Sequence, residues 1–149
     1  MLSVLMTLHL LGVIVWVGGM FFAHMALRPA ATELLEPPQR LPLLRATLTH
    51  FFRWVWLAVI FILLSGYGLL FGLFHGQVGI YVHVMQLLGL VMTGLFLFIY
   101  FVPFPRLCRF LDGGDVPAAG AQMAVIRRII GLNLVLGLLS TIVATSKLF

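Results

Sequence analysis

The side chains of this 149-residue chain that are best suited to chemistry are its five histidines, because only four carboxylates and one cysteine accompany them. His9 and His83 lie in two different apolar segments, near ends that we expect to face the same side of a membrane. Neutral imidazoles projecting from two helices of a bundle can hold the iron of a b-type haem. The pair therefore predicts a haem b centre with His9 and His83 as its axial ligands.

Small and aromatic residues accompany His9 on one stripe of the expected first helix. Helical spacing places on this stripe Gly12, Trp16 and Gly19. The two glycines are expected to clear space for the haem, and the indole is expected to pack against it. The alternative for Trp16 is an ordinary place in the hydrophobic core.

Two polar residues, Arg127 at the entry to the last apolar stretch and Asn133 within it, are candidates for binding a haem propionate or a quinone carbonyl. The alternative for Arg127 is a cationic anchor at the membrane surface. His24 and His50 belong to the opposite side of the membrane from His9, close to several arginines, which suit propionates. A second haem held by these two histidines is therefore an alternative to a single haem.

Two other interpretations of the histidines remain open. Met6 and His9 are three residues apart on one helix, and with His83 they form a soft ligand set that suits Cu(I). In the other interpretation the histidines hold no cofactor and bond across the bundle to polar residues of other helices, such as Gln86, Asn133 or Ser140. Motifs for zinc peptidases, serine hydrolases and phosphate-binding loops do not occur in the sequence.

The composition is that of an integral membrane protein. Hydrophobic residues make up 62% of the chain and charged residues only 9%, whereas soluble domains carry about 25% charged residues. Each of four apolar runs is close to the length of a membrane-spanning helix: residues 2–27, 54–74, 78–101 and 129–146. We expect an all-α, up-down four-helix bundle that forms a single domain over residues 1–149, with the first helix ending at Arg28-Pro29.

The positions of the basic residues indicate how the protein is oriented in the membrane and do not indicate binding of nucleic acid. The net charge is +5, and eight of the nine basic residues surround the first and third connections: Arg28, Arg40, Arg45, Arg53, Arg106, Arg109, Arg127 and Arg128. Because positive residues mark the cytoplasmic side, we expect a multi-pass protein of the bacterial inner membrane with both termini in the periplasm.

Three glycines at four-residue spacing, Gly68, Gly72 and Gly76, end the second apolar run. This spacing allows another helix backbone to approach closely. Packing within one bundle is the favoured interpretation, and a homodimer through this face is the alternative. His75, beside the last of these glycines, is expected to be solvated in a loop.

Several of these residues form a pattern that resembles a known family. The pattern His9-x6-Trp16-x-Gly18-Gly19, followed by Arg28-Pro29, is similar to the opening helix of the CopD superfamily of bacterial inner-membrane proteins. Tyr81-Val82-His83 and Arg127-x3-Gly131-x-Asn133 extend the resemblance over most of the chain. It implies a four-helix core, location in the inner membrane, and a connection with copper or haem.

A related branch, the HemJ-like protoporphyrinogen oxidases, is also short and shares a first-helix histidine and haem b. That branch carries a lysine two residues after the third-helix histidine, where this chain has Met85, so the oxidase activity is not transferred. Our hypothesis from the sequence is a b-type haem protein, an oxidoreductase if it is an enzyme. It would pass electrons from a quinol-like donor in the lipid bilayer to an acceptor at the outer face. The alternatives are a copper-binding or copper-transporting membrane protein and a cofactor-free accessory subunit.

Overall fold

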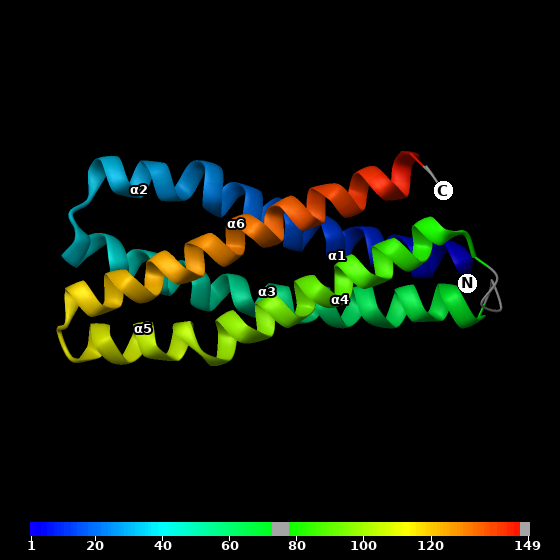
Figure 1. Ribbon diagram of the computed structural model, residues 1–149. Helices are drawn as coiled ribbons and strands as arrows, with labels where there is room; N and C mark the ends of the chain where they lie inside the picture. Colours follow the sequence, from blue (N-terminus) through cyan, green and yellow to red (C-terminus); the bar gives the residue numbers. More distant parts are fainter. Residues whose placement is uncertain (73–77, 147–149) are drawn as a thin grey trace.

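The computed structural model describes residues 1–72 and 78–146, and these residues are almost entirely helical (Figure 1). Along the chain the elements are α1 (Leu2–Phe22), the π-helical segment η1 (Ala23–Leu27), α2 (Arg28–Leu34), α3 (Pro37–Gly72), α4 (Ile80–Phe101), α5 (Pro103–Asp112) and α6 (Val116–Ser146). Because η1 joins α1 to α2 and only Val102 separates α4 from α5, they form four helical rods. Each rod is long and apolar enough to cross a membrane. The predicted all-α four-helix membrane protein is confirmed.

The rods run up and down through the bundle. Met1, the end of α3, the start of α4 and the end of α6 lie at one end, while the α2–α3 and α5–α6 connections lie at the other (Figure 1). We call the first the terminal end. The half of the bundle that contains α2, α5 and all eight arginines is called the arginine half.

The helices extend further than the apolar runs at the arginine half. The second rod begins at Pro37 rather than near residue 54, and the last begins at Val116 rather than near residue 129. Hydropathy marks only the part of a helix that can cross the hydrocarbon core, which about 20 residues suffice to span. The additional turns carry the arginines and form the walls of a cavity described below.

The prediction that the first helix ends at Arg28-Pro29 is wrong. The rod continues to Leu34 because a wide π-helical turn precedes the proline. The backbone N–H of Arg28 donates to the carbonyl of Ala23, five residues earlier. This wider turn relieves the crowding that a proline ring imposes on a regular helix, and proline itself lacks the donor that position would need.

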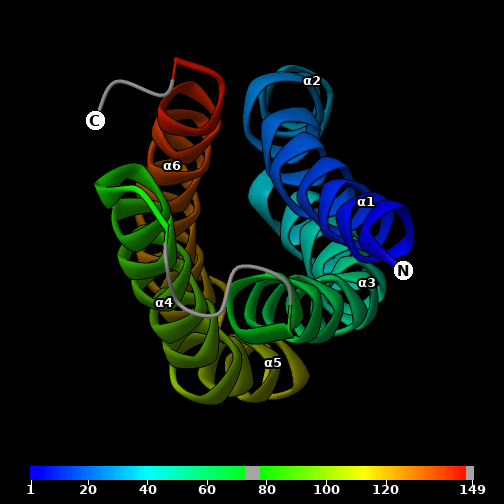
Figure 2. The ribbon, with the colours of Figure 1, turned by 90° about the vertical axis from the view of Figure 1, so that its right-hand side faces the viewer.

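Two helix pairs build the bundle. α1 packs along α3, and α6 packs along both α4 and α5. Contacts of α6 with α1 and α3 join these two groups of helices (Figure 2). Glycines permit the close crossings: a Cβ on Gly12 would lie 2.7 Å from Ile62 Cγ1, and one on Gly19 would overlap the ring of Phe51. Side chains of α3 therefore occupy the space beside both glycines that the sequence analysis assigned to a haem.

An aromatic cluster forms the centre of the core. The ring of Phe96 makes edge-to-face contacts with three neighbours, at centroid distances of 6.3 Å to Trp16, 5.6 Å to Phe52 and 5.3 Å to Trp56. Trp16 is only 3% exposed. Such pairs stabilise by about 0.5–1.5 kcal/mol each beyond their burial, and here they join α1, α3 and α4. Trp16 thus has the core position that was its alternative interpretation.

The predicted glycine face is divided between two environments. Gly68 packs against Leu5 of α1, so it faces the protein's own bundle, whereas a Cβ on Gly72 would meet no atom of the described residues within 4 Å. Gly76 and His75 lie outside the described residues. Packing within the bundle accounts for Gly68, and the homodimer stays a prediction.

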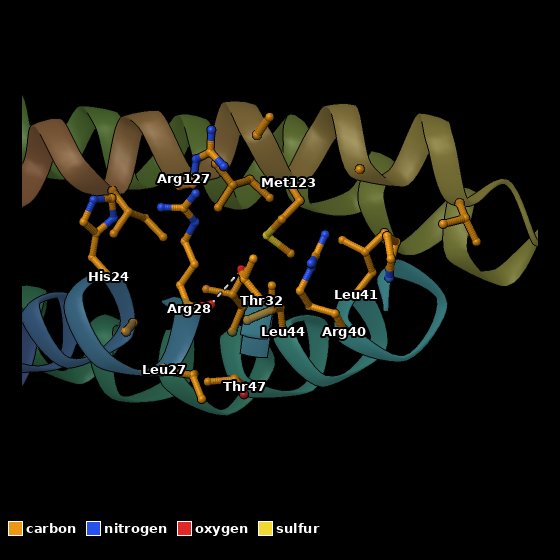
Figure 3. A pocket seen from close by; sticks show the side chains of 18 of the residues that line it. His24, Leu27, Arg28, Thr32, Arg40, Leu41, Leu44, Thr47, Met123 and Arg127 are labelled. Carbon is orange, nitrogen blue, oxygen red and sulfur yellow. Dashed lines mark hydrogen bonds between the residues drawn. The ribbon is translucent and has the colours of Figure 1, made fainter. Parts of the chain in front are cut away.

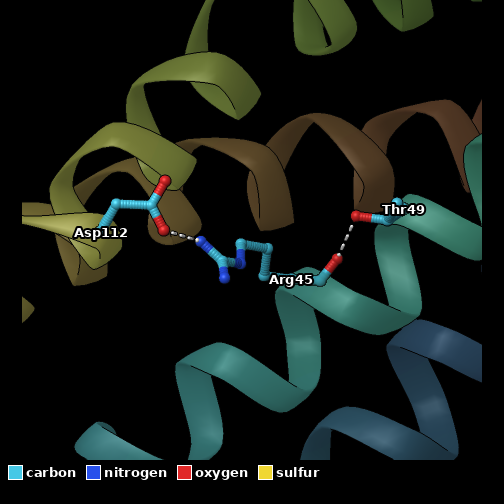
Figure 4. A network of polar contacts seen from close by, with 3 residues as sticks. All are labelled: Arg45, Thr49 and Asp112. Atoms are coloured by element: carbon cyan, nitrogen blue, oxygen red, sulfur yellow. Dashed lines mark hydrogen bonds and ion pairs between the residues drawn. The ribbon is translucent and has the colours of Figure 1, made fainter.

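An ion pair ties α3 to α5 in the arginine half. Arg45 Nη1 donates to Asp112 Oδ1 at 2.7 Å, and Thr49 Oγ1 donates to the backbone carbonyl of Arg45 (Figure 4). The carboxylate side chain is 71% exposed, so the pair contributes about 0–1 kcal/mol. The turn that follows places Gly114 at φ +73°, and Asp115 Oδ1 then accepts from the backbone N–H of Ala118 at the start of α6.

Candidate functional site

The imidazole ring of His9 is held in place by hydrogen-bond partners on α3. Its Nδ1 lies 3.2 Å from the carbonyl oxygen of Ile62 and 3.1 Å from Ser65 Oγ. A backbone carbonyl can only accept, so the hydrogen bond between His9 and Ile62 requires the proton on Nδ1, and in the neutral ring this leaves the lone pair on Nε2. The Ser65 hydroxyl, which also bonds to the backbone carbonyl of Phe61, is the second neighbour of Nδ1.

This pattern is the one that metal-binding histidines use. A ligating imidazole usually donates its other ring N–H to a backbone carbonyl or a similar acceptor, which fixes the tautomer and orients the ring. No hydrogen bond to Nε2 occurs within residues 1–72 and 78–146. The ring rests against Gly66, where an added Cβ would lie 3.4 Å from Cε1. Met6, 42% exposed, lies one turn earlier on α1, so its thioether and His9 share one side of the helix.

The structure places the two predicted axial ligands on different helices, His9 half-buried on α1 and His83 on α4. His83 is exposed on α4, and in the described parts of the chain no Cα atom of α1 lies within 8 Å of one of α4, although the rings of Trp16 and Phe96 bridge the two helices. His24 lines a cavity in the arginine half, but His50 is exposed and is not among the residues that line it. Within those same residues no group of three or more His, Cys, Asp or Glu side chains is placed to hold a metal ion.

The hydrogen-bond partners predicted for the histidines differ from the two partners that His9 has in the structure. His9 bonds to Ser65 and to the backbone of Ile62, whereas the expectation was Gln86, Asn133 or Ser140. Ser65 is one of only two hydroxyl-bearing residues in the apolar part of α3, which is the signal that could have identified it. The bond is fixed by how α1 lies on α3, which helical periodicity does not report.

Asn133 lies in the interior of the bundle, away from Arg127. It is 1% exposed, and its Nδ2 donates to the backbone carbonyl of Met92 at 3.1 Å. Its Oδ1 has no hydrogen-bond partner among the residues that the structure describes. The bond links α6 to α4 beside the aromatic cluster. Arg127, six residues earlier, instead faces the cavity in the arginine half.

A cavity of about 470 Å³ opens between α2, α3 and α6, next to η1. Three arginines, His24 and Met123 line it together with apolar side chains (Figure 3). The arginines come from three different helices: Arg28, Arg40 and Arg127. Arg28 and Arg40 were expected at the first connection and Arg127 at the third, and their meeting around one cavity was not predicted.

Comparison with known proteins identifies one family. The family model described as "Copper resistance protein D" (CopD) matches residues 45–147. No curated protein and no solved structure matches the chain. The matched region contains His83, Arg127 and Asn133, while His9 and His24 precede it. Because the match covers more than half of the chain, this multi-pass membrane protein belongs to the CopD family.

Proposed function

We propose that this protein handles copper in a bacterial inner membrane, and that Cu(I) binds near the terminal end of α1. The match to copper resistance protein D over residues 45–147 carries the proposal. The ligand set that we propose is the Nε2 atom of His9 with the thioether of Met6. The nitrogen of an imidazole and the sulfur of a thioether are donors that suit Cu(I). The hydrogen bond of Nδ1 to the carbonyl of Ile62 favours the tautomer in which Nε2 carries no proton.

Two ligands from one helix leave part of the coordination sphere of the metal open. An open position lets the ion be passed to another donor, which favours transfer of copper over tight storage. His83 is exposed on α4, and we assign it to a separate contact rather than to this ligand pair. His9 precedes the part of the chain that matches the family, so its role rests on its hydrogen bonds and not on the match.

The test is a metal and absorbance analysis of the purified full chain in detergent. We expect a colourless protein that takes up stoichiometric Cu(I) in competition with a chromogenic chelator under reducing conditions. A Soret band that shifts on reduction with dithionite would instead support the haem b hypothesis and the quinol-linked electron transfer that follows from it. Absence of both copper and haem would support a cofactor-free accessory subunit and overturn the proposal.

The orientation that we propose places the arginine half on the cytoplasmic side and both termini in the periplasm, in accordance with the positive-inside rule. In a Cys108→Ser background, a single cysteine is introduced at Ser3 or at Gln39, which are exposed at opposite ends of the bundle. A membrane-impermeant maleimide should label Ser3→Cys in intact spheroplasts and Gln39→Cys only after lysis. The reverse labelling pattern would show that the orientation is wrong.

A further inference from the structure

The cavity in the arginine half brings together three guanidinium groups. Arg28 and Arg127 point towards each other across the space between α2 and α6, and Arg40 points into the same space from the start of α3 (Figure 3). The guanidinium groups of Arg127 and Arg40 are close enough to Arg28 to repel it. Three like charges around one cavity are unfavourable unless an anion lies among them.

No carboxylate of the described chain supplies that anion. None of the residues that line the cavity is acidic. Glu33 and Glu36 are exposed, and the one ion pair found among residues 1–72 and 78–146 joins Arg45 to Asp112, outside the cavity. Cationic residues that only set the orientation of a membrane protein need to lie near its cytoplasmic surface. They need not converge, and Arg128, the neighbour of Arg127, is exposed and does not line the cavity.

The position and the remaining walls of the cavity indicate what kind of anion fits. Arg28 follows Leu2 by 26 residues, or about 39 Å of helix, which places it just beyond a hydrocarbon core of about 30 Å, at the level of the lipid headgroups. Apart from Thr32 and Thr47, the rest of the lining is mostly apolar and includes Leu27, Leu41, Leu44 and Ile126. A small hydrophilic anion would leave this apolar surface uncovered, whereas an amphiphile covers it.

We propose that this cavity binds an amphiphile with a phosphate or carboxylate head, which the guanidinium groups of Arg28, Arg40 and Arg127 hold while Leu41, Leu44 and Ile126 contact its apolar part. Guanidinium groups bind both kinds of oxyanion through paired, charge-assisted hydrogen bonds. Basic pockets between membrane helices at the bilayer surface suit anionic phospholipid headgroups. The other source of this chemistry is a porphyrin with its carboxylates, for which His24 lies on the same wall. The site is independent of copper binding at His9.

The experiment measures the thermal stability of the full chain in dodecyl maltoside with added lipid. Saturating cardiolipin should raise the melting temperature by about 5 °C, and phosphatidylcholine should not. The rise should disappear in the double variant Arg28→Gln/Arg127→Gln. The double variant Arg53→Gln/Arg128→Gln is the matched control, because it removes the same charge at exposed positions outside the cavity and should keep the rise.

A second experiment distinguishes a phospholipid from a porphyrin as the ligand of the cavity. Titration with haemin should leave the Soret band at the position of free haemin if the site is made for phospholipid. A Soret shift that depends on Arg28, Arg127 and His24, without a cardiolipin effect, would support a carboxylate-bearing ligand in the same cavity. The proposal is overturned if neither ligand has an effect, or if both double variants lose the effect equally. Removal of like charges relieves repulsion, so the variants should fold, and circular dichroism checks this.

Discussion

Replacement of His9 with alanine is expected to abolish Cu(I) binding by the purified protein. Loss of an outer-shell partner of a ligand typically weakens metal binding by about 10–100-fold, and removal of the ligand itself should exceed this range. Ser65→Ala should weaken binding by only about 10-fold, because the carbonyl of Ile62 still accepts from Nδ1 and keeps the lone pair on Nε2. Competition with a Cu(I) chelator measures all of these affinities.

The control for this prediction is His50→Ala. His50 is an exposed histidine on α3 and lies in the arginine half, far along the bundle from His9, so its removal should leave Cu(I) affinity unchanged. If His9→Ala bound copper as tightly as the unmodified chain while His83→Ala lost it, the copper site would lie on α4. Our assignment of the ligand pair on α1 would then be wrong.

Replacement of Gly12 with valine is expected to cause a clear loss of stability. An added Cβ would lie 2.7 Å from Ile62 Cγ1 and 3.1 Å from the backbone oxygen of Ala58. Because the backbone of α3 cannot turn aside as a side chain can, the two helices must separate. Overpacking of this kind costs about 1–3 kcal/mol, and separation of α1 from α3 would also loosen the hydrogen bonds at His9.

Gly18→Val is the matched control, since it makes the same change on the same helix at a position where no atom of another helix in the described chain lies within 4 Å of the added Cβ. Thermal unfolding in detergent, followed by circular dichroism, should show a clearly lower melting temperature for Gly12→Val and little change for Gly18→Val. Equal melting temperatures for the two variants would contradict the observed packing of α1 on α3. Weaker Cu(I) binding in Gly12→Val alone would further support a site that depends on the contact between these helices.

Composition and hydropathy were sufficient to predict much of the fold. A chain with 9% charged residues and four long apolar runs has few alternatives to membrane-spanning helices, since a helix satisfies every backbone hydrogen bond internally. The expectation failed where local backbone geometry departs from a regular helix. The π-helical turn at Ala23–Leu27 carries the first rod through Pro29, and it changes the direction of every later side chain on that rod relative to the stripe that contains His9.

The sequence by itself determined that several helices have a face unsuited to lipid, because helical spacing places polar residues such as His9 and Asn133 on those faces. Only the tertiary structure decided which faces meet: His9 with Ser65, 56 residues away, and Arg28 with Arg40 and Arg127 around one cavity. The physical reason is that lipid tails and neighbouring helices are about equally apolar. Hydrophobicity therefore does not select the partner of each helix, and close packing at glycines such as Gly12 does.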